Sequence, residues 1–469
     1  MIHRAVETLL VASGAFVLGY YLLVNGTYLL VHLAALFKLR DDLRDRRWGP
    51  MYQQFSSPFL PGVAVVVPAY NEAPVIVESV QSLLNLNYPD VEILVVNDGS
   101  DDGTLDRLAS AFDLTALGSE PPLDVPTAPI RTVYRSRDAD ELLVLDKENG
   151  GKSDALNAGV WLTDQPLFCA IDADSIIERD GLLQVVQPFL EHPEETVATG
   201  GTVRVANGCR IERGQVHDAG LPSAALGRLQ VVEYLRAFYA GRLGLDRLGG
   251  LLLISGAFGV FRTDVVREIG GYSTACVTED FELVVRLHRR LVETGRSYRV
   301  HFVPEPVVWT EVPGTLSQLA RQRARWYRGL VDTLWTHRTL FGNARYGRVG
   351  LFAVPAFLLV ELLGPLIEGT GYVLVAVGLA LGLVDPSFTA TYLLVTIGLG
   401  LVLSWLGVYS EVWSFRRYDE PRQVLSLLAA GVLENFGYRQ WKTFVAWRGL
   451  VEYLRGVESW GDLSRRGFE

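Results

Sequence analysis

The chain has 469 residues, and its 43 Lys and Arg against 53 Asp and Glu give a formal net charge of -10. This balance lacks the basic footprint of nucleic-acid-binding proteins, so no nucleic-acid partner is expected. The three cysteines are scattered without metal-ligand spacing, which is typical of reduced residues in a cytosolic domain. The chain is long enough for one large globular domain and, at 49% hydrophobic residues, apolar enough for membrane segments.

The first predicted element is a transmembrane helix between Leu9 and Phe37, where Asn25 and His32 are the only strongly polar residues. This run exceeds the roughly 20 residues needed to cross a bilayer. A cleaved signal peptide is the alternative, but its apolar core would span only roughly 7 to 15 residues. The run is followed by a basic flank, which predicts an external amino terminus and a cytoplasmic continuation: Lys38, Arg40, Arg44, Arg46 and Arg47.

After Pro61 and Gly62 the pattern alternates between strands and helices. A continuous β-branched run at 63–67 predicts a buried strand of a parallel sheet, and the segments 91–96, 130–134 and 167–171 predict three more strands. Helices are expected over 73–84, from Thr104 onward and over 152–162, and the segments 119–128 and 135–148 are expected to be surface loops. The alternation predicts an α/β nucleotide-binding half-sheet, which binds ligands at the carboxyl ends of its strands.

Polar residues follow the first two strands at that edge. Asp98 comes two residues after the second apolar run, where a carboxylate can accept hydrogen bonds from a base or a ribose. The segment from Pro68 through Tyr70 to Glu72 can wall the same pocket. An ordinary turn role for Asp98 in Asn-Asp-Gly-Ser is an equal alternative.

Lys152 follows Gly150 and Gly151 at the start of an expected helix. Free backbone N–H groups and the helix dipole favour an anion there, so a phosphate would fit. The spacing of P-loop enzymes is absent, and the alternative is a solvated lysine after a turn.

Asp172 and Asp174 directly follow the fourth apolar strand. Two neighbouring carboxylates repel each other unless a cation holds them, and hard oxygen ligands suit Mg²⁺ or Mn²⁺ bridging phosphates. The alternative is a cap or turn before Ser175.

Glu279 and Asp280 open an amphipathic stretch over 281–291, so a helix amino terminus is the structural interpretation. The functional interpretation is a general base, because a carboxylate near a diphosphate and apolar neighbours can gain enough basicity to take a hydroxyl proton. Asp280 is the first candidate and Glu279 the second.

Residues 318–326 alternate polar and cationic side chains at helical spacing. Gln322, Arg325 and Trp326 can present two donors and a ring to one cavity, because the planar fork of arginine suits a diphosphate and tryptophan suits the apolar face of a sugar. A basic amphipathic helix on a membrane surface is the alternative.

Two further apolar blocks, 349–384 and 392–412, predict a second and a third transmembrane helix. The turn at 385–387 has no Lys or Arg, whereas Arg416 and Arg417 follow the last block, so the turn is expected outside. Glu361 and Glu368 share one helix face, which suggests a cavity or a polysaccharide path; a kinked interfacial segment is the alternative.

The tail contains an apolar run at 424–432 that is too short to cross a membrane. Basic residues with aromatic rings between them follow it, among them Arg439, Lys442 and Trp447. We expect helices on the inner membrane surface with basic groups outward and rings inserted, and a fourth crossing as the alternative.

Taken in order, these motifs resemble the membrane-embedded family 2 glycosyltransferases, such as poly-N-acetylglucosamine, hyaluronan and cellulose synthases. The resemblance covers roughly residues 63–330 and the flanking spans. It is carried by Pro-Ala-Tyr-Asn-Glu at 68–72, Asp-Gly-Ser at 98–100, Gly-Gly-Lys at 150–152, Asp-Ala-Asp at 172–174, Thr-Glu-Asp at 278–280 and Gln-Arg-Ala-Arg-Trp at 322–326. Six ordered matches are far more specific than any single one.

The resemblance implies a GT-A fold, a nucleotide-diphosphate sugar donor that is usually UDP-linked, and inversion by direct displacement. By motif, Asp98 would contact the nucleoside, Lys152 the diphosphate, and Asp172 and Asp174 the nucleotide and the metal, while Asp280 would deprotonate the acceptor. The remaining matches imply a donor pocket lined by Pro68, Tyr70, Glu72 and Arg325, and an acceptor site with Ser255, Gly256, Gln322 and Trp326.

The sequence therefore predicts an α/β GT-A domain inserted between transmembrane helices. The expected parts are a first helix with its basic flank at 1–48, a cytoplasmic catalytic domain at 49–340, two transmembrane helices at 341–418 and interfacial helices at 419–469. We expect a processive enzyme of the inner (plasma) membrane that extends a β-linked polysaccharide from a UDP-sugar, with UDP-GlcNAc as one candidate, and with room for export partners. Single transfer to a lipid or lipid-linked acceptor, and a non-catalytic scaffold for export, are the alternatives.

Overall fold

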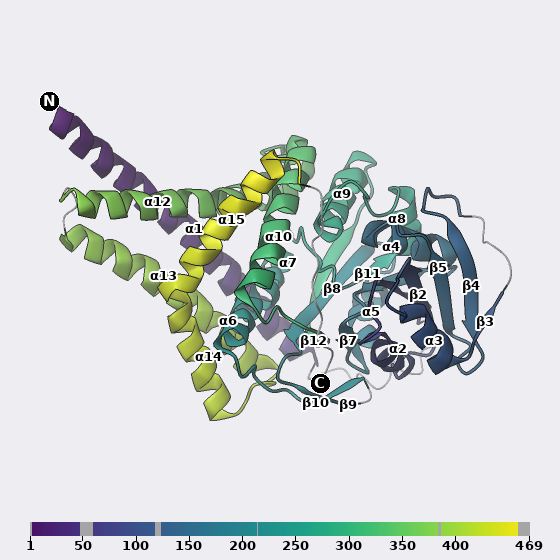
Figure 1. Cartoon of the computed structure of the whole chain (residues 1–469). Coiled ribbons are helices and arrows are strands. Elements are labelled where there is room, and N and C mark those ends of the chain that lie inside the picture. Colours follow the sequence, from purple (N-terminus) through teal and green to yellow (C-terminus); the bar gives the residue numbers. More distant parts are fainter. Residues whose placement is uncertain (1, 47–59, 118–122, 213, 383–385, 458–469) are drawn as a thin grey trace. The chain divides into compact units, whose positions relative to one another are not determined.

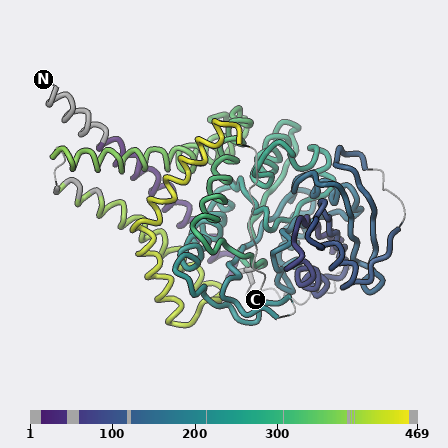
Figure 2. Tube along the Cα trace, in the orientation of Figure 1, coloured from purple at the N-terminus to yellow at the C-terminus, as the bar shows by residue number. Residues whose placement is uncertain are grey.

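The computed structural model describes residues 2–46, 60–117, 123–212, 214–382 and 386–457 (Figures 1 and 2). These residues divide into two compact units. The first unit is made of the described residues within Met1–Lys38, Ala224–Gly250 and Pro313–Gly461, and the second of those within Leu39–Ser223 and Leu251–Val312. Arg47 and Asp385, where the basic flank ends and the external turn begins, lie outside the described residues.

A ten-stranded mixed sheet forms the second unit, with the strand order β3-β4-β5-β2-β1-β6-β11-β8-β12-β7. Its strands β5, β2, β1 and β6 are parallel neighbours, whereas β11 runs antiparallel between β6 and β8. The bounds are β1 Val63–Ala69, β2 Val91–Asp98, β3 Leu114–Ala116, β4 Ile130–Ser136, β5 Leu142–Lys147, β6 Leu167–Ile171, β7 Ser175–Ile177, β8 Thr196–Val205, β11 Phe258–Arg262 and β12 Arg299–Thr310. The strands β9 (Arg210–Glu212) and β10 (Gln215–Asp218) form a separate two-stranded sheet.

The four strands expected from apolar runs are β1, β2, β4 and β6, and all four are confirmed. Residues 63–67 of β1 are fully buried, as expected of a strand inside a sheet that is covered on both faces. The helices α3 (Thr104–Phe112) and α4 (Lys152–Leu162) begin where the sequence predicts. Helix α2 (Ile76–Leu84) begins three residues later than expected, because the Ala73 N–H donates to Asp102 before the helix starts.

The expectation of a surface loop over 135–148 is wrong. Residues 142–147 form β5, which pairs in parallel with β2 and antiparallel with β4. Asp140 and Glu141 occupy the turn before it, and Leu142, Val144 and Leu145 are buried. The apolar run is only four residues long and charges flank it on both sides, so periodicity alone assigned it to the charged loop.

Three more helices complete the second unit: α5 (Gly181–Glu191), α8 (Thr263–Glu268) and α9 (Glu279–Glu293). Helix α9 confirms the amphipathic stretch, because Phe281, Val284, Leu287 and Leu291 are buried at helical spacing. Helix α4 packs closely on β1 through Gly159, where an added Cβ would lie 2.4 Å from Cγ1 of Val66. This contact lets the second half of α4 lie directly on the middle of β1.

The first unit is helical (Figure 1). Three of its helices contain segments long and apolar enough to cross a membrane, at Gly14–Arg44, Val349–Ala380 and Leu393–Ser414, which agrees with the three predicted spans. The bounds are α1 Ile2–Arg46, α6 Ala225–Glu233, a π-helical segment η2 Tyr234–Gly241, α7 Arg242–Arg247, α10 Leu316–Thr336, short turns η3 Arg338–Leu340 and η4 Ala344–Tyr346, the continuous η5 Val349–Ala353, α11 Val354–Ala356, η6 Phe357–Leu362 and α12 Leu363–Ala380, then α13 Pro386–Ser414, α14 Pro421–Leu433, η7 Glu434–Tyr438 and α15 Arg439–Leu454.

The expectation that the basic groups of the tail point outward is wrong for Arg439 and Lys442. Both side chains are about one-fifth exposed and lie against carboxylates of the helical unit, Glu368 and Glu233 respectively. Trp447 donates its indole N–H to the Pro365 carbonyl instead of inserting into a membrane surface. Helix α15 therefore packs within the unit. From the sequence alone, charges that are paired inside a protein cannot be distinguished from those of a solvated basic face.

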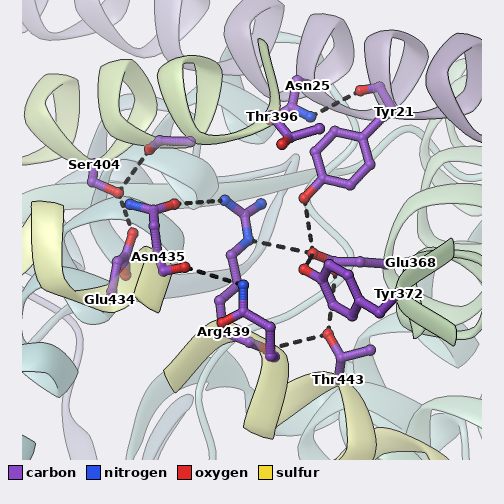
Figure 3. Close-up of polar contacts among 12 residues, drawn as sticks. Tyr21, Asn25, Glu368, Tyr372, Thr396, Ser404, Glu434, Asn435, Arg439 and Thr443 are labelled. Carbon is purple, nitrogen blue, oxygen red and sulfur yellow. Dashed lines mark hydrogen bonds and ion pairs between the residues drawn. The ribbon is translucent and has the colours of Figure 1, made fainter. Parts of the chain in front are cut away.

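Figure 3 shows the polar contacts around Glu368 on α12. Its carboxylate accepts hydrogen bonds from the hydroxyls of Tyr21, at 2.8 Å, and Thr443, at 3.3 Å, and from Tyr372, and Nε of Arg439 lies 3.8 Å away. Glu361, earlier in the same span, accepts from the Tyr28 hydroxyl at 2.7 Å. Both acidic residues of the second span are thus satisfied by α1 and α15, as buried polar groups require.

The grouping of the chain differs from the division expected from sequence, in which 49–340 formed one domain. Residues 224–250 and 313–340 belong to the helical unit with the apolar helices, because α6 and η2 pack on α14 and α13 and α10 packs on α15. The expected boundaries at 48, 340 and 418 remain predictions.

Candidate active site

The sheet register brings four loops of the second unit to one edge. Ala69 pairs with Asn97 across the parallel strands β1 and β2, so the loops after both strands begin side by side. The loop after β6 starts at the same edge because β6 is the other parallel neighbour of β1. Strand β11 is antiparallel to β6 and pairs Phe258 with Ile171, so its preceding loop, residues 255–257, joins the others.

Lys152 contacts polar groups from three other segments of the unit. Its Nζ lies 2.6 Å from Oδ1 of Asp172 and 3.0 Å from Oε1 of Glu279, and it donates to the Gly256 carbonyl at 3.2 Å. The side chain is 18% exposed, so it is shielded but can still be reached. Burial alone would lower the pKa of Lys152, but Asp172 and Glu279 outweigh it and hold the pKa well above its usual range. The ammonium stays charged, as a group that binds a diphosphate must.

Asp280 is held by backbone amides. Its Oδ2 accepts from the Gly256 N–H at 2.7 Å, and its Oδ1 accepts from the Phe281 N–H at 2.8 Å. An added Cβ on Gly256 would lie 3.1 Å from Oδ2 of Asp280 and 3.2 Å from Nζ of Lys152, so only glycine fits without displacing one of them. Thr278 precedes α9 and makes no side-chain capping bond, and Glu279 and Asp280 lie in the first turn of the helix, so the helix amino terminus expected as the structural interpretation is present.

Burial, with the nearby Glu279 carboxylate, raises the pKa of Asp280 to about 6, although Lys152 and the two amides oppose the rise. A carboxylate with this pKa is deprotonated at neutral pH and is basic enough to accept a proton from a hydroxyl in a transition state. The electrostatics of the site are therefore compatible with the predicted general base.

Asp98 is buried and already bonded within the chain. Its Oδ1 accepts from Nζ of Lys147 at 2.7 Å and from the Gly150 N–H at 2.9 Å, and its Oδ2 accepts from the Gly151 N–H at 2.8 Å. Asp98 therefore engages the amides of Gly150 and Gly151, which directly precede α4. Contact of Asp98 with a nucleoside remains a prediction that must use its remaining acceptor capacity.

Lys147 was missed by sequence reasoning. It is fully buried and lies 2.7 Å from Asp98 and 2.6 Å from Asp154, so one ammonium joins the ends of β2 and β5 to the first turn of α4. The residue belongs to the segment expected to be a loop, and a lysine at the end of a strand gives no signal of burial. This ion triad fixes the glycine loop that carries Lys152.

The loop after β1 is tied to the loop after β2. The Asn71 N–H donates to Oγ of Ser100 at 3.0 Å, and Oδ1 of Asn71 accepts from the Asp101 N–H at 2.9 Å. Pro68 is the sixth residue of β1, and Glu72, in the loop that follows, is buried. Tyr70, between them, is 51% exposed. This exposed ring at the sheet edge is compatible with a wall of a donor pocket.

Asp172 and Asp174 lie on the turn between β6 and β7, with Asp172 about one-third exposed and Asp174 buried. The Ser175 N–H closes this turn on the Asp172 carbonyl at 3.0 Å, so the turn role expected as an alternative is also present. Among the described residues no group of three or more His, Cys, Asp or Glu side chains could hold a metal. Two carboxylates fit Mg²⁺ or Mn²⁺ nonetheless, since such ions usually take one or two carboxylates and complete their shell with phosphate and water.

Gln322, Arg325 and Trp326 lie in the other unit, on the long helix α10, and all three are partly exposed. Oε1 of Gln322 is buried and accepts no hydrogen bond from the described residues. Buried polar atoms are rarely left without a donor, so this amide oxygen is suited to a ligand hydroxyl. The expected helix is confirmed, and the roles of its three candidate residues remain predictions.

The mixed sheet belongs to the GT-A class of glycosyltransferase folds. The models "Glycosyl transferase family 2" and "Glycosyltransferase like family 2" match residues 64–123 and 131–329. These matches identify the chain as a family 2 glycosyltransferase.

Its relatives agree with this assignment. The poly-β-1,6-N-acetyl-D-glucosamine synthase of Staphylococcus aureus is 26% identical over 305 residues, which cover 65% of this chain and 62% of that protein. The synthase of the same name from Staphylococcus epidermidis is 26% identical over 269 residues, 57% of this chain and 54% of that protein. The chain thus matches less than two-thirds of the length of these relatives.

Among solved structures, the mannosyltransferase of Pyrobaculum calidifontis in complex with GDP-Man and Mn²⁺ superposes with a TM-score of 0.52 at 17% identity. The superposition covers 90% of this chain and 99% of that one, and it supports the fold.

Proposed function

We propose that the chain is a processive, inverting glycosyltransferase that extends a β-linked polysaccharide from a UDP-sugar. The observation that carries the proposal is the convergence of Lys152, Asp172, Glu279 and Asp280 around Gly256 at the ligand-binding edge of the sheet. A cation for a diphosphate and a carboxylate of raised pKa stand there next to each other, as displacement of a nucleotide by a hydroxyl requires.

In the proposed reaction the acceptor hydroxyl oxygen attacks the anomeric carbon and its proton goes to Asp280. The anomeric carbon–oxygen bond to the diphosphate breaks on the opposite face, and UDP leaves with the electron pair. Lys152 neutralises part of the charge that develops on the diphosphate. The Gly256 and Phe281 amides fix the Asp280 carboxylate so that its orientation needs no adjustment during the proton transfer.

Asp172 and Asp174 would hold the divalent ion. Bound there with the donor phosphates, Mg²⁺ or Mn²⁺ would act as a Lewis acid that stabilises the leaving diphosphate. The P. calidifontis mannosyltransferase, which shares the fold, was solved in complex with GDP-Man and Mn²⁺, and this is compatible with a divalent ion at the two aspartates.

The names of the staphylococcal relatives support a polymer as the product and N-acetylglucosamine as the first sugar to test. Gln322 and Trp326 would contact the acceptor sugar and Arg325 the leaving diphosphate, while Tyr70 and Asp98 would contribute to nucleoside binding. The three apolar helices support a multi-pass protein of the inner (plasma) membrane, with the basic flank after the first span favouring a cytoplasmic catalytic unit.

The test uses the full chain purified in detergent, with UDP-GlcNAc and Mn²⁺. Wild type should release UDP, and Asp280→Asn should bind the donor yet turn over about 10² to 10⁴ times more slowly, the usual contribution of a general base. Asp264→Asn is the matched control, since its side chain is 62% exposed on α8, and it should behave as wild type. Normal turnover in Asp280→Asn would refute the base assignment.

Single transfer to a lipid or lipid-linked acceptor would use the same site, so product length decides between the two. A ladder of labelled products from one labelled donor supports chain extension, and one product of fixed length supports single transfer. A non-catalytic export scaffold predicts no UDP release and no heat of UDP and Mn²⁺ binding by calorimetry.

A further inference from the structure

Glu233 lies at the end of α6, in the helical unit, and its side chain is only 10% exposed. Its carboxylate is surrounded by donors from three other positions of the chain. Oε2 lies 3.2 Å from the Arg323 guanidinium on α10 and accepts from the Tyr438 hydroxyl at 3.1 Å, while Oε1 accepts from Nζ of Lys442 on α15 at 2.8 Å. A buried carboxylate with two cations and a hydroxyl is fully committed to holding these elements together.

Arg323 connects this cluster to a ring of the acceptor motif. Its Cζ lies 4.0 Å from the centre of the Trp326 ring, one helical turn further along α10. A guanidinium over an indole face at this distance is an attractive cation–π contact. The same ring meets Phe238 of η2 at 5.7 Å between centres with a tilt of 55°, so Trp326 is held on two sides.

The charge of Glu233 is what keeps Arg323 in this position. Arg323 and Lys442 are two cations that share one carboxylate, and both are largely shielded from water, with side chains 10% and 23% exposed. Without the carboxylate the two cations repel each other with little screening. The guanidinium, on its flexible stem, would then turn away from the ring.

We propose that Glu233 is a positioning residue for the Trp326 ring and acts through Arg323, and thus sets how the enzyme binds its acceptor sugar. This rests on the proposed function, in which Trp326 stacks on the acceptor. Of the proposed donor-binding groups, Lys152 and Asp172 belong to the other unit and Arg325 lies on α10, so we expect the acceptor KM to change more than the donor KM.

The first experiment does not depend on activity. The full chain is labelled with 5-fluorotryptophan in detergent, and the Trp326 resonance is assigned by its loss in Trp326→Phe. Glu233→Gln, which keeps the shape and removes the charge, should move or broaden that resonance. Glu452→Gln is the matched control. Glu452 on α15 pairs with Arg328 of the same helix α10, with Oε2 of Glu452 3.6 Å from Nε of Arg328, so the substitution should leave the Trp326 resonance in place.

The second experiment measures transfer from UDP-GlcNAc to a β-1,6-linked N-acetylglucosamine tetramer. Glu233→Gln should raise the acceptor KM about tenfold while the donor KM stays within about twofold. In a Trp326→Ala background the same change should add nothing, since the ring it holds is gone. Glu452→Gln should keep both KM values.

An unmoved Trp326 resonance in Glu233→Gln overturns the proposal, whatever the enzyme does. Equal rises of the donor and acceptor KM, or effects of Glu233→Gln and Trp326→Ala that multiply, also overturn it. If wild type transfers no sugar while the resonance moves, the proposed function fails and Glu233 still holds the ring, so the two failures are distinguishable.

Discussion

The charged sites of the two units are built differently. In the sheet unit, Asp172 follows β6, whereas Lys152 and Asp280 lie in the first turns of α4 and α9. Strand ends and helix starts therefore bring these groups to one edge of the sheet. In the helical unit, Glu368 in the first half of α12 meets Arg439 at the start of α15, and nothing in the local sequence of either residue indicates its partner (Figure 3). A sheet edge collects functional groups by topology, whereas a helix bundle pairs them by side-chain packing.

The largest effect that tests this comparison is expected at Lys147. Lys147→Met would leave Asp98 and Asp154 buried without their cation, and breaking such a buried pair costs about 3–5 kcal/mol of the free energy of unfolding. Urea unfolding of the detergent-solubilised protein measures it. Arg131→Met, which removes a 52% exposed partner of Asp146 in the same sheet, should cost at most about 1 kcal/mol, and an equal cost for both would contradict a special role of the buried triad.

In the helical unit the matching change is Arg439→Met. It removes the cation near Glu368, but three hydroxyls still donate to that carboxylate, so we expect a loss of about 1–3 kcal/mol. The double variant Glu368→Gln, Arg439→Met should recover part of this loss in the same unfolding assay. Arg448→Met is the control, since Arg448 is 54% exposed, and a strictly additive double variant would show that the pair does not interact.

The sequence predicted most of the sheet edge and little of the bundle interior for physical reasons. Apolar runs that end in Asp-Ala-Asp or Asn-Asp-Gly locate a strand end, and strand ends share an edge. The strand β5 was missed because its four apolar residues are flanked by charge, and the ion triad of Lys147 was missed with it. Arg439 and Lys442 were expected on a surface because an isolated helix pattern cannot distinguish a solvated charge from one paired 71 or more residues away.

The pH dependence tests the electrostatics of the sheet edge. Because burial and Glu279 raise the pKa of Asp280 to about 6, its base form is present above that pH and is lost as the pH falls. We expect kcat/KM for the donor to decline about tenfold per pH unit below pH 6 and to be flat toward pH 8. Glu279→Gln removes the neighbouring negative charge, so it should move this limb to lower pH; an unmoved limb would assign the titration to another group.

The smallest effect should come from Gly256→Ala. Its Cβ would lie 3.1 Å from Oδ2 of Asp280 and 3.2 Å from Nζ of Lys152, so one of these groups must shift by a few tenths of an ångström. Catalysis depends on placement of reacting groups, and we expect kcat to fall about five- to tenfold with the free energy of unfolding changed by less than about 0.5 kcal/mol. Gly398→Ala, where the added Cβ meets open space in α13, is the matched control and should change neither quantity. An unaltered kcat in Gly256→Ala would mean that catalysis does not depend on how the sheet edge places Asp280 and Lys152.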